Sequence, residues 1–180
     1  MSLEKAKAIF GWMPESELEW LRQQAAIHKS IVEVGSFMGR STRALADNTR
    51  GTVTAVDTWA GSDEEEHRKL LEGKPKDWLF EEFQRNMAGC KNVFPLQRFS
   101  VDAANALRGH LFDFIFLDAS HDYANIKADI LAWRPLLAPW GLFSGHDYQT
   151  GAPGVIQAVD ELLLNRKIFE SIWYWQPLWA

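Results

Sequence analysis

The sequence lacks several features that would assign it to common classes of protein. It has one cysteine, Cys90, so no disulfide can form within the chain. No apolar run approaches the ~20 residues of a membrane span, and the N-terminus has no signal-peptide core. The net charge of −5 is opposite to the basic face that nucleic acids require. These absences predict a cytoplasmic protein that binds neither membrane nor nucleic acid.

Two phosphate-binding patterns are also missing. The dinucleotide fingerprint G-x-G-x-x-G needs its second glycine so that the backbone can approach a pyrophosphate. Phe37 occupies that position here, and its side chain would crowd a diphosphate. No G-x-x-x-x-G-K-[ST] loop is present either. The pattern therefore favours a nucleoside ligand without phosphates.

A strand–turn–helix–strand pattern marks where such a nucleoside would bind. An apolar run over residues 31–34 leads into a glycine-bearing turn, and a helical pattern opens at Ser41. A second run over residues 52–57 ends in Asp57, which follows Gly35 by 22 positions, near the ~20 typical of a ribose-binding carboxylate. S-adenosylmethionine (SAM) is the obvious candidate. An ordinary β-α-β turn that uses glycine only for packing is the alternative.

The remaining pattern alternates strands and helices, which predicts a doubly wound, mostly parallel α/β sheet covered on both faces. We expect one domain over residues 1–180, with a helical N-terminal extension (1–29) and a substrate-side insertion (59–92). Expected strands are 31–34, 52–57, 93–99, 112–117 and 142–144, with one or two more within 168–179. Expected helices are 16–27, 41–47, 79–87, 103–107, 125–137 and 155–164. Nine tryptophans are many for this length, and a few could line a pocket for a flat or sugar-like substrate.

A second group of polar residues follows two neighbouring strands. Asp118 and His121 come after strand 112–117, and His146 and Asp147 come after strand 142–144. Ligands of such sheets bind beyond the carboxyl ends of the strands, so these side chains should converge there. His121, His146 and Asp147 are the candidate catalytic residues, since a histidine can act as general base near neutral pH. Alternatively, the group could hold a divalent cation that polarises a substrate hydroxyl. Carboxylates suit Mg²⁺, whereas the histidines favour Mn²⁺, Fe²⁺ or Zn²⁺.

Several segments together resemble class I SAM-dependent methyltransferases, in the branch catalogued as methyltransferase family 24. They are E-V-G-S-F-M-G-R-S-T (33–42), V-D-T-W (56–59), F-Q-R-N-M (83–87), F-D-F-I-F-L-D-A-S-H-D-Y (112–123), K-A-D-I (127–130), G-H-D-Y (145–148) and G-V (154–155). The pairing of D-x-x-H-x-Y with G-H-D-Y is more specific than the glycine turn. The likeness covers nearly the whole chain.

The resemblance implies roles for particular residues. The turn from Glu33 to Gly39 should contact the methionine part of SAM, Asp57 the ribose, and residues 100–102 the adenine. The cofactor-binding set is then Glu33, Gly35, Ser36, Gly39, Ser41, Asp57, Thr58, Trp59, Ser100, Asp102 and Asp118. Related antibiotic and sugar O-methyltransferases bind a metal at positions matching Asp118, His146 and Asp147. The acceptor implied is a small molecule, with a sugar hydroxyl plausible.

Two departures from the family pattern matter. His146 stands where the relatives usually carry an acid, which puts Mg²⁺ in doubt. The short tail leaves little chain for the usual terminal antiparallel hairpin, so a shortened C-terminal edge is expected. Two other functions stay open: a metal-dependent hydrolase or hydroxylase-like enzyme, and a non-catalytic SAM-binding module. A homo-oligomer is compatible with each.

Overall fold

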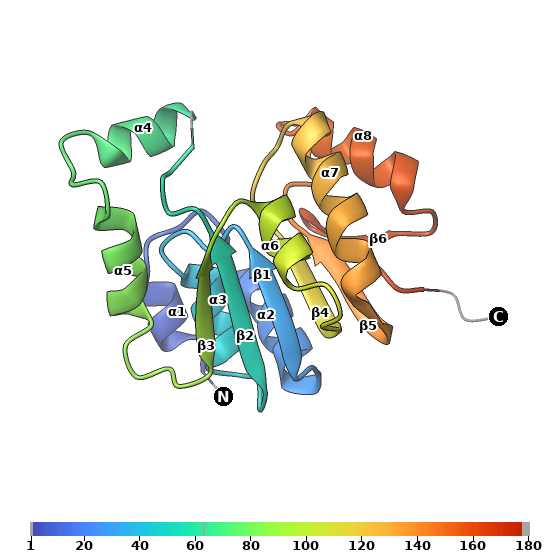
Figure 1. Ribbon diagram of the computed structural model, residues 1–180, viewed down its shortest axis with the longest axis horizontal. Coiled ribbons are helices and arrows are strands. Elements are labelled where there is room, and N and C mark those ends of the chain that lie inside the picture. Colours follow the sequence, from blue (N-terminus) through green and yellow to red (C-terminus); the bar gives the residue numbers. More distant parts are fainter. Residues whose placement is uncertain (1, 63, 178–180) are drawn as a thin grey trace.

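A seven-stranded sheet organises the computed structural model, which describes residues 2–62 and 64–177 (Figure 1). The strands are β1 (Ser30–Val34), β2 (Thr52–Asp57), β3 (Val93–Gln97), β4 (Phe112–Leu117), β5 (Leu137–Gly145), β6 (Lys167–Phe169) and β7 (Ile172–Trp175). Their order is β3-β2-β1-β4-β5-β7-β6, and β1 to β5 are mutually parallel. The carboxyl ends of these five strands therefore lie along one edge, as expected for a doubly wound sheet.

Helices cover both faces of the sheet. They are α1 (Glu4–Ala8), α2 (Glu15–Ile27), α3 (Arg40–Ala46), α4 (Glu65–Leu71), α5 (Trp78–Asn86), α6 (Ser100–Ala106), α7 (Tyr123–Trp133), the 3-10 turn η1 (Arg134–Leu136) and α8 (Pro153–Leu162). Successive side chains of a strand point to opposite faces. Ile31 accordingly packs in the core cluster of α2 and α3, whereas Val32 packs in the cluster of α6, α7 and α8. Burial on both faces explains why the strands are almost continuously apolar.

Several element boundaries differ from the sequence prediction, and two of them lie near proline or glycine residues. Helix α7 ends at Trp133 rather than near residue 137, because Pro135 lies in the 3-10 turn η1 that follows at Arg134. Strand β5 begins at Leu137 and runs through Pro139 and Gly141, which were expected to precede it. The insertion 59–92 carries two helices, α4 and α5, where one was predicted.

The C-terminal edge of the sheet has short strands, but both strands of the terminal antiparallel hairpin are present. Strand β7 pairs antiparallel with β5, and β6 pairs antiparallel with β7. The strands have only three and four residues. The short tail therefore suffices for the terminal hairpin, contrary to the expectation that little chain was left for it.

In the described part of the chain, no helix is long and apolar enough to cross a membrane.

Candidate active site

The turn after β1 is held in a conformation that few residues adopt. Gly35 has φ +92°, and a Cβ built there would lie 2.0 Å from the carbonyl oxygen of Asp118. Phe37 follows with φ +46°. Its N–H donates to one carboxylate oxygen of Asp57 (2.8 Å), and the N–H of Trp59 donates to the other (2.7 Å). Asp57 thus fastens the turn after β1 to the turn after β2. Burial raises its pKa, although these two backbone donors oppose the shift.

A cavity of about 460 Å³ opens beside this turn, over the carboxyl ends of β1, β2 and β4. Six predicted cofactor-binding residues line it: Gly35, Asp57, Thr58, Ser100, Asp102 and Asp118. They come from the ends of β1, β2 and β4 and from the start of α6. We call this space the cofactor cavity.

Three predicted cofactor residues lie behind the turn rather than on the cavity wall. Glu33 is fully buried, and one of its carboxylate oxygens accepts a hydrogen bond from Thr42. Burial raises the pKa of Glu33 to about 7. Trp59 is buried in the core, and its indole N–H donates to the carbonyl of Phe37 (2.8 Å). Gly39 has φ +89° and begins α3, against Met87. These residues shape the turn from inside the protein.

A second cavity, of about 270 Å³, adjoins the first. Ser36 and Ser41, also predicted to bind the cofactor, line this space with the four residues of the second polar group, Asp118, His121, His146 and Asp147. Gly35, Phe37 and Asp118 belong to the walls of both cavities. A ligand in the cofactor cavity can therefore face a second ligand in the smaller cavity.

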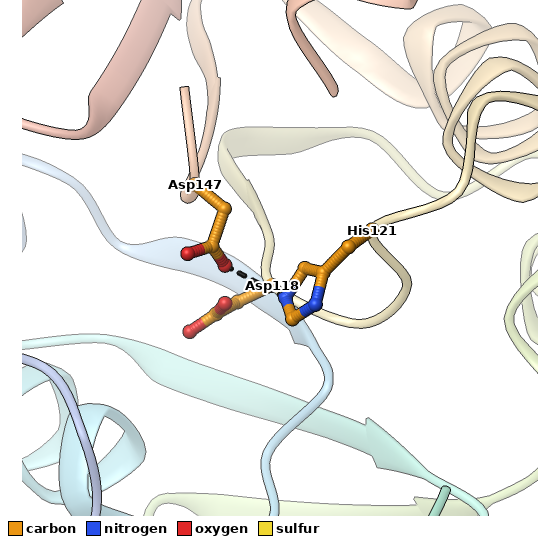
Figure 2. A group of neighbouring side chains, drawn as sticks. All are labelled: Asp118, His121 and Asp147. Carbon is orange, nitrogen blue, oxygen red and sulfur yellow. Dashed lines mark ion pairs between the residues drawn. The ribbon is translucent and has the colours of Figure 1, made fainter. Parts of the chain in front are cut away.

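The four polar residues converge as the parallel topology predicted. Figure 2 shows Asp118, His121 and Asp147 side by side, with His121 paired to Asp147. His121 Nε2 lies 2.8 Å from Asp147 Oδ2, and His146 Nδ1 lies 3.1 Å from the same oxygen. His146 Nδ1 is also 3.5 Å from Asp118 Oδ1. Asp147 therefore sits between the two imidazoles.

Two further carboxylates complete this cluster, and the sequence analysis missed both. Glu17 of α2 is only 1% exposed, and its Oε2 lies 2.7 Å from His146 Nε2. Its other oxygen accepts a hydrogen bond from the backbone N–H of Ser171 (2.9 Å). Glu64, just before α4, places Oε1 2.8 Å from His121 Nδ1. The available signal for Glu17 was its position beside Leu18 and Leu21 on the buried face of a helix, where an acid needs a partner.

The surrounding carboxylates keep protons on both imidazoles. The hydrogen bond to Asp147 is the main reason that the pKa of His121 is raised to about 9. Burial opposes a proton on His146, but the charge of Asp118 and hydrogen bonds to neighbouring carboxylates raise its pKa well above the usual range. Burial would raise the pKa of Asp147, yet hydrogen bonds from the two histidines lower it. Neither imidazole therefore keeps the pKa near ~6.5 of a free histidine, which a general base near neutral pH would need.

The residues that could hold a cation differ from the predicted set. Ligand atoms of Asp118, His121 and Asp147 lie within 4.8 Å of one another. His146 is not part of this group, and its Nε2 faces Glu17. Two carboxylates and one imidazole fit a divalent ion such as Mn²⁺, Fe²⁺ or Zn²⁺. His121 would have to release its proton to bind one.

Comparison with known proteins identifies the family. The model of the methyltransferase domain, family 24, matches residues 32–148. This chain belongs to that family. It is a class I SAM-dependent methyltransferase, and its sheet order and flanking helices agree with that assignment. No curated protein matches the sequence.

Solved structures share the fold of the methyltransferase at low sequence identity. The O-methyltransferase NovP aligns with TM-score 0.66 and 18% identity, covering 91% of this chain and 80% of its own. The calicheamicin methyltransferase CalS11 aligns with TM-score 0.67 and 14% identity, covering 89% and 77%. The methyltransferase PaMTH1 of Podospora anserina, solved with S-adenosylhomocysteine (SAH), aligns with TM-score 0.64 and 17% identity, covering 97% and 86%. At these identities the likeness concerns the fold alone.

Proposed function

We propose that the protein transfers the methyl group of SAM to a hydroxyl of a small molecule. One observation carries this proposal: the cofactor cavity and the smaller cavity meet at Gly35, Phe37 and Asp118, beside a cluster of histidines and carboxylates. A methyl donor in the first space would face an acceptor in the second. NovP is named as an O-methyltransferase and CalS11 as a TDP-rhamnose 3′-O-methyltransferase, which supports oxygen as the acceptor atom.

In this reaction the acceptor oxygen attacks the methyl carbon, the carbon–sulfur bond breaks, and SAH leaves. The hydroxyl proton must pass to a base. His121 is the group we propose, because it lines the acceptor side and is 40% exposed in its side chain. Its neutral form would accept the proton, and Asp147 would stabilise the resulting imidazolium.

His146 has a different place in the proposal. Its two nitrogens face Glu17 and Asp147, so it carries a proton and holds the two carboxylates together. A divalent cation, if bound, would be held by Asp118, His121 and Asp147 and would lower the pKa of an acceptor hydroxyl. In that case His121 could not be the base.

Calorimetric titration of SAM and SAH, with and without Mg²⁺, Mn²⁺ or Zn²⁺, tests the cofactor and the cation together. We expect SAM to bind without added metal, and Asp57→Ala to weaken it by roughly 1–3 kcal/mol, as two ribose hydroxyls lose a charged acceptor. SAH release in the presence of a hydroxylated acceptor then tests the reaction. Tighter binding of NADH than of SAM would contradict the proposal.

A chelator distinguishes the metal-free mechanism from the metal-assisted one by its effect on turnover. If His121 is the base, a chelator leaves turnover unchanged. If the cation polarises the hydroxyl, a chelator abolishes turnover and added cation restores it. Loss of turnover on chelation with no recovery under any of the three cations would count against both versions.

A further inference from the structure

Aromatic rings line the smaller cavity together with the charged cluster. Trp12, Phe37 and His67 form what we call the aromatic wall, and all three border the cavity. The ring centroids of Trp12 lie 5.1 Å from those of both Phe37 and His67. Phe37 and His67 are stacked at 5.0 Å with an interplanar angle of 7°. Trp12 is 50% exposed although it is large and apolar, which suits a ring that contacts a ligand.

The aromatic wall is built from segments outside the glycine turn as well as from the turn itself. Trp12 lies between α1 and α2, outside the residues 32–148 that match the family. Arg40 fastens this segment, since its guanidinium donates to the carbonyls of Met13 (3.1 Å), Ile9 (2.8 Å) and Lys7 (2.9 Å). The wall is thus anchored to the first residue of α3.

The charge of the smaller cavity is unsuited to an anionic ligand. Four carboxylates line it: Glu64, Glu66, Asp118 and Asp147. Two cationic groups at this cavity, His121 and His146, are already paired with carboxylates. Arg40 is bonded to backbone carbonyls, His121 lies between Asp147 and Glu64, and the Nε2 of His146 faces a buried glutamate. Among the described residues that line this cavity there is no lysine. A phosphate there would lie beside four carboxylates and would compete with them for the protons of His121 and His146.

We propose that the acceptor is a single hydroxyl-bearing ring without phosphate or carboxylate, stacked on the aromatic wall with its hydroxyls toward Asp118, His121 and Asp147. This inference rests on the proposed methyl transfer and narrows its substrate class. A cavity of about 270 Å³ has room for one ring, since pockets for drug-sized ligands begin near ~300 Å³. The sugar would then be methylated as a free or neutral glycoside, not as a nucleotide-sugar.

Binding to the SAH-loaded protein tests this independently of turnover. The probes are 4-nitrophenyl hexosides and catechol, each paired with its phosphate monoester, followed by saturation-transfer NMR and titration. We expect at least one neutral ring to bind, and each neutral ring that binds to do so at least about tenfold more tightly than its phosphate ester. Trp12→Ala should weaken the neutral ring about tenfold and leave SAH affinity within about twofold, and Trp12→Phe should restore most of the loss.

A matched control is Trp140→Ala, which removes a 74% exposed tryptophan on β5 that lines neither cavity and should change nothing. Equal or tighter binding of a phosphate ester overturns the inference. So does the absence of binding by every neutral ring, or an unchanged affinity in Trp12→Ala. Failure of the proposed function looks different: the wild-type protein would fail to bind SAM, or would bind SAM and a ring without releasing SAH.

Discussion

Glu17 is expected to position a residue of the active site, because it bonds His146 directly. It is a buried carboxylate held at one oxygen by Ser171 and at the other by His146. We expect Glu17→Gln to lower kcat roughly tenfold or more, the usual cost of losing a partner that orients a functional side chain, with little change in SAM affinity. Steady-state kinetics that separate kcat from KM provide the measurement. The control is Glu19→Gln on the same helix, where the glutamate pairs with Arg22 instead. A parallel loss of melting temperature and SAM binding would indicate a purely structural role.

The pH profile reports which group takes the proton. The pKa of His121 is raised to about 9, so at lower pH most molecules carry a protonated imidazole that cannot act as a base. Turnover by the metal-free enzyme should therefore rise about tenfold per pH unit and level off only near pH 9. His121→Gln should remove this limb. A plateau near ~6.5, the pKa of a free imidazole, would mean that the neighbouring carboxylates do not act on His121.

Glu33 links the protonation of a buried group to stability. Its pKa of about 7 in the folded protein lies above the ordinary 4.5, so folding favours the neutral form. The contribution of Glu33 to the free energy of unfolding should then be largest below pH 4.5 and be lost as the pH rises through 7. The fall is on the order of 3 kcal/mol, because one pKa unit is worth about 1.4 kcal/mol.

Denaturant unfolding over this pH range tests that dependence. Glu33→Gln should flatten the curve, since glutamine does not titrate. Thr42→Val removes the hydroxyl that bonds the carboxylate and should steepen the curve. An unchanged slope in both variants would mean that other groups control the pH dependence.

Among the structural elements, the turn between β1 and α3 leaves little room for added atoms. A Cβ on Gly35 would meet backbone of Asp118 at 2.0 Å, whereas one on Gly39 would meet the flexible end of Met87 at 2.6 Å. Both glycines have positive φ, so both substitutions are strained. Gly35→Ala should therefore cost more than about 2 kcal/mol of stability and abolish SAM binding, while Gly39→Ala should cost less. Thermal melts and SAM titration of the two variants measure these losses of stability and of SAM binding. A Gly35→Ala protein with wild-type stability would contradict the geometry.

The sequence was most informative about elements whose pattern is local. The apolar runs before Gly35 and Asp118 gave the strands, because strands buried on both faces need nearly continuous apolar residues. It was less informative at element boundaries, where a proline can either follow the end of a helix or lie in an irregular strand. Pro139 falls between the expected helix 125–137 and the expected strand 142–144, yet it lies inside β5, where a register shift against β4 accommodates it.

At the scale of the whole molecule, the sequence predicted those parts of the site that topology alone brings together. Asp118 and Asp147 follow adjacent parallel strands, so their meeting required no knowledge of side-chain packing. Glu17 and Glu64 could not be placed this way. Glu17 lies on α2 and Glu64 just before α4, outside the parallel core, and their contacts with the histidines depend on how those segments dock. The same holds for Trp12, whose position depends on the anchoring by Arg40.

Phe37 lies at the boundary between the two cavities, and this has a kinetic consequence. Its backbone N–H donates to Asp57 on the cofactor side, while its ring stacks with His67, which lines both cavities. An occupied cofactor cavity would hold Asp57 and the turn more rigidly and so set the angle of that ring before the acceptor arrives. Entry would then be ordered, with SAM first and SAH last to leave. By reciprocity, a bound acceptor would raise the affinity of the protein for the cofactor by the same factor, so high acceptor concentrations should inhibit by retaining SAH.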